Sequence, residues 1–169
     1  MSKSKNLKIR PARIDDIGLI TEIYNDAIIH TTATFDTEPK SLEDQKAWFL
    51  DHGSTFPILI AELEGKVIGW ASLSRWSIKK AYSQTVELSI YIDKPQREKG
   101  FGRKLMETII GEGKQAGFHT ILARIAEGNK VSLHLHKVLG FKLVGVMREV
   151  GRKFDQLLDV HLMQLVFER

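Results

Sequence analysis

Cysteine is absent from this sequence of 169 residues. Its absence excludes disulfide bonds, zinc–thiolate sites and a cysteine nucleophile, and it fits the reducing environment of the cytoplasm. Long apolar runs are also missing, since none approaches the roughly 20 residues that a membrane-spanning helix needs. No signal-peptide core follows the polar residues 1–6. We therefore expect a cytoplasmic protein that is not inserted in a membrane, with residues 1–6 as a flexible tail.

Neither sign of charge dominates, because 25 lysines and arginines oppose 21 aspartates and glutamates and leave a net charge of +4. This mild excess permits an anionic ligand but gives no reason to expect a nucleic-acid partner. The six histidines show no metal-binding spacing, since His134 and His136 on one helix point their rings apart. We expect no metal. Linkers and repeats are missing too, which predicts one soluble domain over residues 1–169.

What the sequence does contain is an alternation of apolar segments typical of an α/β fold. Helical spacing in some segments and extended apolar runs in others give the order β-α-α-β-β-β-α-β-α-β-β. This order predicts a mixed sheet with helices on both faces. We expect Asp15 or Asp16 to cap the first helix and Ser41 the second. The expected helices cover residues 17–27, 42–50, 103–115 and 129–139, and the expected strands cover residues 7–10, 56–62, 67–73, 85–92, 120–125, 141–146 and 157–167.

The most informative segment is the turn at residues 96–102, Gln-Arg-Glu-Lys-Gly-Phe-Gly, between an expected strand and an expected helix. Glycine lets the backbone approach a ligand closely, and a helix start offers unpaired N–H groups and a positive dipole end. The segment therefore predicts a pyrophosphate site. It is neither a P-loop nor a dinucleotide fingerprint, because Arg103-Lys104-Leu105 follows Gly102. A tight turn with solvated basic side chains is the alternative interpretation.

Glu87 is an acid within the otherwise apolar strand that leads into this turn. Strand alternation places Glu87, Ser89 and Tyr91 on one face, opposite the apolar residues of the strand. A carboxylate in this position is a candidate general base. From the strand alone, an acid on a solvated sheet face is the simpler interpretation.

Several motifs in order resemble the GNAT superfamily of N-acetyltransferases. The spacing Arg97-x-x-Gly100-x-Gly102 resembles the acetyl-CoA motif of that family, and residues 135–141, Leu-His-Lys-Val-Leu-Gly-Phe, resemble its helix end. A narrower match is to phosphinothricin acetyltransferase and its relatives. The match is carried by residues 23–27, 32–35, 38–39, 47–49, 81–82, 85–92, 150–154, 158–160 and 163–164, so the resemblance covers nearly the whole chain.

The resemblance implies a central mixed sheet that is splayed between its fourth and fifth strands, with acetyl-CoA in the gap. The backbone of the turn would bind the pyrophosphate, and the preceding strand would pair with the pantetheine arm. Asn129 would hydrogen-bond the same arm, with a plain helix cap as the alternative. Ser132 would reach the cofactor or belong to the helix start. The residues expected to bind acetyl-CoA are Ile90, Tyr91, Ile92, Arg97, Glu98, Lys99, Gly100, Phe101, Gly102, Asn129 and Ser132.

For the reaction, the resemblance implies that Glu87 takes the amine proton, directly or through a water. A primary amine with a pKa of ~10 is mostly protonated at pH 7, so a positioned base removes part of the barrier. Backbone N–H groups of residues 89–91 would stabilise the oxyanion if a bulge frees them from the sheet. His136 stands where many members carry tyrosine, and it is either a proton donor to the leaving thiolate or a structural histidine. The family also implies a homodimer.

The acceptor implied by the resemblance is a small amino-acid-like amine of the phosphinothricin, methionine sulfoximine or methionine sulfone type. Relatives carry an aromatic residue and then arginine after the third strand, where this chain has Trp76-Ser77. Either Arg75 or Lys79-Lys80 supplies the positive charge instead, or the acceptor differs. A peptide or protein N-terminus as acceptor and a non-catalytic CoA-binding sensor are the alternatives. The expected acceptor site comprises Phe35, Arg75, Trp76, Ser77, Tyr82, Thr85, Val86 and Glu87.

Overall fold

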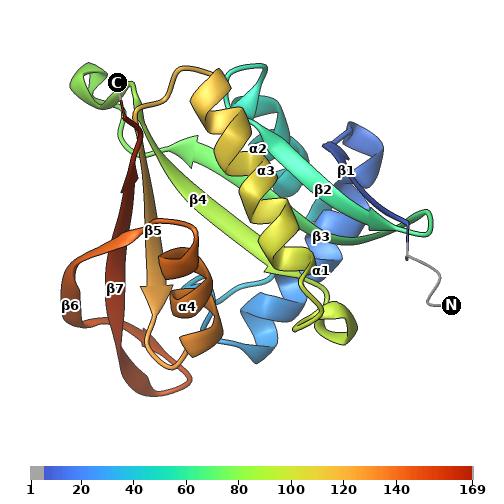
Figure 1. Ribbon diagram of the computed structural model, residues 1–169. Helices are drawn as coiled ribbons and strands as arrows, with labels where there is room; N and C mark the ends of the chain where they lie inside the picture. The colour runs from blue at the N-terminus through green and yellow to red at the C-terminus, as the bar shows by residue number, and fades with distance from the viewer. Residues whose placement is uncertain (1–5, 169) are drawn as a thin grey trace, which may run out of the picture.

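Seven strands form one mixed sheet in the order β1-β2-β3-β4-β5-β7-β6 (Figure 1). The structure is a computed structural model that describes residues 6–168, so the expected tail lies, apart from Asn6, outside the described residues. Strands β4 and β5 run parallel, and the other neighbours run antiparallel. The α/β order predicted from the sequence is confirmed. The strands are β1 (Leu7–Pro11), β2 (Ile58–Leu63), β3 (Lys66–Arg75), β4 (Thr85–Ile92), β5 (Thr120–Ala126), β6 (Lys142–Lys153) and β7 (Gln156–Val166).

Helices cover both faces of the sheet, as predicted (Figure 1). One face carries α3 (Phe101–Gln115) and α4 (Lys130–Val138), and the other carries α1 (Ile17–His30) and α2 (Leu42–His52). The apolar stripe of each helix packs on the sheet, which leaves two hydrophobic clusters with the strands between them. No helix within residues 6–168 combines the length and the apolar character that crossing a membrane requires.

The starts of the first two helices differ, and the sequence predicted only one of them. Helix α2 begins with a capping box, in which the Ser41 hydroxyl accepts from the Asp44 N–H at 3.1 Å. Of the two candidates, Asp16 occupies the N-cap position of α1, but its side chain makes no capping hydrogen bond there, contrary to the prediction. Its carboxylate instead accepts from the Arg13 N–H at 2.7 Å and pairs with Arg10 at 2.8 Å. This happens because a short 3-10 turn precedes α1, and the strong Arg10 donor lowers the pKa of Asp16.

The expected splay of the sheet lies between β4 and β5. Within the described residues these strands are in register only at Thr85–Thr120, Val86–Ile121 and Glu87–Leu122, and then they part. The bulge expected near residues 89–91 is absent, because β4 keeps an unbroken register with β3 from residue 86 to residue 92. It is also unnecessary, since the parting of β5 leaves the outer edge of β4 without a strand partner.

Strand β6 is longer than the sequence predicted, reaching Lys153 instead of ending at residue 146. The register with β7 shifts between Met147 and Gly151, and this irregularity breaks the apolar alternation that marks a strand. Phe154 and Asp155 then form a two-residue turn with positive φ values of 50° and 58°, as in a type I′ hairpin. The extension brings the end of β6 beside the loop between α1 and α2.

Candidate active site

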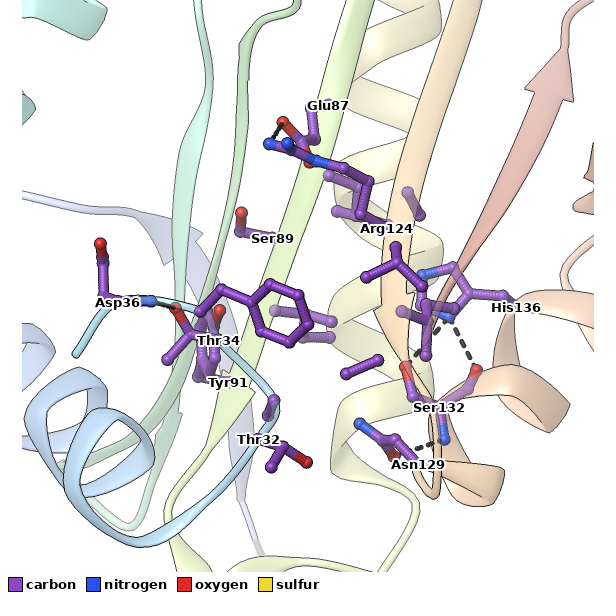
Figure 2. Close-up of a pocket in the computed structure, with 18 of the residues that line it drawn as sticks. Thr32, Thr34, Asp36, Glu87, Ser89, Tyr91, Arg124, Asn129, Ser132 and His136 are labelled. Carbon is purple, nitrogen blue, oxygen red and sulfur yellow. Dashed lines mark hydrogen bonds and ion pairs between the residues drawn. The ribbon is translucent and has the colours of Figure 1, made fainter. Parts of the chain in front are cut away.

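A cavity of about 560 Å³ opens where β4 and β5 part. Its walls come from the ends of both strands, the start of α4, the loop between α1 and α2, and residues of β6 and β7 (Figure 2). The fold thus unites residues that the sequence places on separate segments. Of the residues predicted for the site, the cavity brings together Phe35, Glu87, Ile90, Tyr91, Asn129, Ser132 and His136.

The turn that leads into α3 presents free backbone donors. Gly100 has a φ of 82°, a left-handed conformation that glycine adopts without strain. The N–H groups of residues 98–103 make no hydrogen bond within the described part of the chain. They stand at the start of a 15-residue helix, whose dipole adds positive potential there. This geometry fits an anion site.

The basic side chains of the turn brace it. The Arg97 Nε group donates to the carbonyl oxygen of Ile92 at 2.9 Å, and the Lys99 ammonium donates to that of Pro95 at 2.7 Å. Both cations lie near the start of α3 and add to its positive potential. The backbone N–H groups are therefore the direct donors that the turn leaves open, and the cations support them.

Glu87 lies on the cavity side of β4, at the last residue pair that joins β4 to β5. The predicted alternation is confirmed, since Tyr91 packs with α1 whereas Leu88 packs in the cluster under α3. The Glu87 carboxylate accepts two hydrogen bonds from Arg124, from Nε at 2.5 Å and from Nη2 at 2.8 Å. The Glu87 side chain is only 19% exposed, so it is not an acid on a solvated face.

Arg124 is a site residue that the sequence analysis missed. It projects from β5 across the gap, and its guanidinium lies 5.6 Å from the centre of the Trp76 ring. The hydrogen bonds to Glu87 raise the pKa of Arg124, so it stays charged. A signal was available, because Arg124 interrupts the apolar strand of residues 120–126 as Glu87 interrupts its own strand.

The residues predicted to bind the acceptor at the end of β3 and the start of β4 do not line the cavity. Arg75 places its guanidinium over the Phe56 ring, 5.6 Å from the ring centre, and Val86 is fully buried in the core under α3. Their side chains therefore point away from Glu87. Ser77, Tyr82 and Thr85 do not line the cavity either, whereas Trp76 reaches the site through Arg124.

The loop between α1 and α2 lines the cavity and is fastened to β6. The ammonium of Lys153, on β6, donates to the carbonyl oxygen of Thr34 at 2.8 Å and is only 4% exposed. The Phe35 ring lies against Gly151, where a Cβ atom would come within 2.1 Å of the ring. The Tyr24 hydroxyl bonds to Thr34 and Asp36. Sequence reasoning missed Lys153 because its partner is 119 residues away.

Asn129 caps α4 and still has a free donor. Its Oδ1 accepts from the Ser132 N–H at 3.1 Å, which confirms the cap. Its Nδ2 group makes no hydrogen bond within residues 6–168 and faces the cavity in Figure 2. The cap thus orients the amide toward the gap between the strands. The Ser132 hydroxyl lies on the same wall, 3.3 Å from His136 Nδ1.

His136 is buried, with 3% exposure, and it is tied to its own helix. Its Nδ1 donates to the carbonyl oxygen of Ser132 at 2.7 Å, and its ring packs edge-on against Phe141. Burial lowers the pKa of His136, so the ring is neutral at pH 7. The proton it carries is therefore held by a carbonyl group and is not aimed into the cavity.

The buried histidines predict loss of stability in acid. Burial also lowers the pKa of His52, as it does that of His136. At a pH between the folded and the unfolded pKa of either ring, the unfolded chain therefore binds more protons than the folded protein. The stability they contribute is full above a pH of about 6.5 and is lost as the pH falls through the folded values. We expect the free energy of unfolding to drop between pH 7 and pH 5, by up to about 1.4 kcal/mol per pH unit for each ring.

Urea denaturation across this range measures the effect. His136→Gln should show a smaller slope than the wild type, whereas His134→Gln, at an exposed position of the same helix, should keep the wild-type slope. Equal slopes for all three proteins would contradict the assignment to His136.

Residues 9–162 match the family described as the acetyltransferase (GNAT) domain. The chain belongs to this family. Among GNAT relatives, the L-methionine sulfoximine/L-methionine sulfone acetyltransferase of Pseudomonas aeruginosa is 40% identical over 159 residues, which cover 93% of this chain and 92% of that protein. The phosphinothricin N-acetyltransferase of Streptomyces coelicolor is 33% identical, over 95% and 96% of the two chains.

A solved GNAT structure agrees closely with the fold. The structure of yncA from Salmonella typhimurium with its cofactor acetyl-CoA matches at a TM-score of 0.95 and 36% identity, over 97% of this chain and 95% of that chain. The predicted GNAT fold is thereby confirmed. Within residues 6–168, no three histidine, aspartate or glutamate side chains are grouped so as to hold a metal ion.

Proposed function

We propose that this protein transfers the acetyl group of acetyl-CoA to the amine of a small amino-acid-like acceptor, of the methionine sulfoximine, methionine sulfone or phosphinothricin type. The observation that carries the proposal is the position of Glu87, a carboxylate on the wall of the 560 Å³ cavity at the point where β4 and β5 part. The names of the GNAT relatives support the acceptor class. The chain would act as a single acetyltransferase domain.

The residues that would hold acetyl-CoA fit its chemistry. The free N–H groups of residues 98–103 suit the pyrophosphate. The pantetheine arm carries amide groups, which need donors and acceptors along an extended path. The Asp93 N–H donates to the Ile68 carbonyl oxygen on β3 at 2.8 Å, so alternation turns the N–H and carbonyl groups of Ile90 and the N–H group of Ile92 toward the gap. Together with the Asn129 amide, they offer hydrogen bonds along the gap, and Ile90 and Asn129 line the cavity.

In the reaction, the bound donor supplies a thioester, and the chain's own residues handle the proton and the charge. Glu87 would accept the amine proton as the C–N bond forms and the C–S bond breaks. The N–H group of Ile90 would donate to the negative charge that develops on the thioester oxygen. The leaving thiolate needs little assistance, because a thiol pKa is ~8.5.

His136 has a supporting role in this proposal. Its Nδ1–H is bonded to Ser132 and its lowered pKa keeps the ring neutral, so it would shape the wall beside the thioester rather than donate a proton. Of the two roles left open for His136, the proposal therefore takes the structural one.

Two further features belong to the proposal. A homodimer would cover the apolar side chains that the β6–β7 hairpin exposes, namely Leu143, Val144, Val150, Phe154, Leu157 and Val166. A cytoplasmic location follows from the proposed use of acetyl-CoA, a metabolite of that compartment.

A thiol-release assay with the purified protein tests the proposed function. The expected result is sustained release of CoA thiol from acetyl-CoA with methionine sulfone or methionine sulfoximine, and a product whose mass is increased by one acetyl group. Binding of acetyl-CoA without sustained release in a panel of amino-acid analogues, peptides and polyamines would contradict an enzyme and favour a CoA-binding sensor.

A further inference from the structure

The ion pair between Glu87 and Arg124 closes the space in which the amine of the acceptor must stand. Figure 2 shows the two side chains meeting across the gap between β4 and β5. Both carboxylate oxygens are occupied, at 2.5 Å and 2.8 Å. A proton moved onto Glu87 would leave Arg124 without its anion, so the pair opposes proton transfer until another anion takes the place of Glu87.

We propose that Arg124 binds the carboxylate of the acceptor, and that an amino acid opens the Glu87–Arg124 pair by supplying both of its charges. This inference rests on the proposed function and specifies its substrate as a free amino-acid zwitterion. The ammonium group goes to Glu87 and the carboxylate goes to Arg124. One ion pair is thereby exchanged for two, and no charge is left without a partner.

Arg124 is suited to such an exchange. A guanidinium presents two parallel N–H donors to a carboxylate, and it uses this geometry on Glu87 already. Trp76 supports the other side of the group, with 5.6 Å between the guanidinium carbon and the ring centre. This stacking holds the guanidinium in the gap when Glu87 moves away. The Arg124 side chain is 54% exposed, so a solute can reach it.

The exchange discriminates between acceptors. A simple amine has no anion to give Arg124, so its binding to Glu87 leaves a cation unpaired. A peptide N-terminus has the same defect, because its first carboxyl group is an amide. Of the described residues that line the cavity, Arg124 is the one lysine or arginine. Arg75 lies over the Phe56 ring, outside the cavity. Relatives carry an arginine at the position of Ser77. In this chain Arg124 on β5 would supply that positive charge instead.

The test compares acceptors that differ only in this charge. Methionine sulfone, its carboxamide and a dipeptide beginning with methionine sulfone are assayed with the wild type, Arg124→Met and Arg124→Lys. The wild type is expected to prefer the free acid over both other acceptors by about 10²-fold in kcat/KM, the effect of losing the charge-assisted hydrogen bonds to Arg124. Arg124→Met should lose about 10²-fold with the acid and nothing with the carboxamide. Arg124→Lys should fall between them.

Arg75→Met is the matched control, because it removes an arginine stacked on an aromatic ring at the same 5.6 Å but outside the cavity. It should keep the wild-type ratio between acid and carboxamide. The inference is overturned if the wild type uses acid and carboxamide equally, or if Arg124→Met weakens both alike. Absence of thiol release with every acceptor would defeat the proposed function instead. Calorimetric binding of methionine sulfone then decides the inference, since binding must be lost in Arg124→Met and kept in Arg75→Met.

Discussion

Replacement of Glu87 by glutamine is expected to lower kcat by about 10²–10⁴-fold near neutral pH, the usual contribution of a positioned general base. Glutamine keeps the size of the side chain but cannot take a proton from the amine. The loss should be largest at low pH, where the amine is almost fully protonated in solution. It should shrink as the pH rises toward the pKa of the amine, because the acceptor then arrives without its extra proton. Thiol release measured from pH 6 to pH 9 gives this profile.

A matched control for Glu87→Gln is Glu107→Gln. Glu107 is also a carboxylate in an ion pair with arginine, at 2.8 Å from Arg103, but it lies on the exposed surface of α3. Its replacement should leave the pH profile unchanged. A profile for Glu87→Gln that parallels the wild type over the whole range would remove Glu87 from the role of base.

Replacement of Lys153 by methionine is expected to raise the KM for the acceptor at least ten-fold, because a hydrogen bond from a charged donor is worth about 1.5–3 kcal/mol. The lost bond is the one to the Thr34 carbonyl, which fastens the loop with Phe35 over the cavity. The KM for acetyl-CoA should stay the same, since residues 98–103 are not involved. Steady-state kinetics with each substrate varied in turn separates the two effects.

The thermal stability of Lys153→Met should change little, which distinguishes loss of the fastening from general unfolding. Burial lowers the pKa of Lys153, a sign that its charge is costly there, and an apolar side chain avoids this cost. Lys142→Met removes an exposed lysine of the same strand and serves as the control. A large fall in Tm, or a rise in both KM values, would show that Lys153 holds the fold rather than the loop.

Local chemistry explains which parts of the site the sequence predicted. Glu87 and the turn at residues 96–102 are unusual within their own segments, so a pattern a few residues long identifies them. The cap at Ser41 was predicted for the same reason, since its partner Asp44 is three residues away. Asp16 failed as a cap because Arg10 from the preceding strand competes for its carboxylate.

Long-range register explains what the sequence did not predict. Arg124 faces Glu87 only because β5 lies parallel to β4 and is in register with it at Glu87–Leu122. Gly151 lies under Phe35 only because the register of β6 shifts after Met147. Neither contact can be predicted from the sequence of the two segments involved. A charged residue inside an apolar strand was the one available signal, and it applied to Arg124 as well as to Glu87.

The short junction between β4 and β5 divides the sheet into two parts, strands β1 to β4 and strands β5 to β7, which can open separately. Strands β1 to β4 are paired along their lengths. Strands β5, β6 and β7 join them through three residue pairs, the Glu87–Arg124 ion pair and the cluster beneath α3 and α4, and the Lys153 hydrogen bond ties β6 to the loop between α1 and α2. Amide hydrogens exchange with solvent through local openings that often follow such units. The C-terminal hairpin is therefore the part expected to exchange first. A molecule bound in the gap between β4 and β5 would slow that exchange. Its binding would therefore be detected as slower exchange of β6 and β7 amides that do not contact the bound molecule.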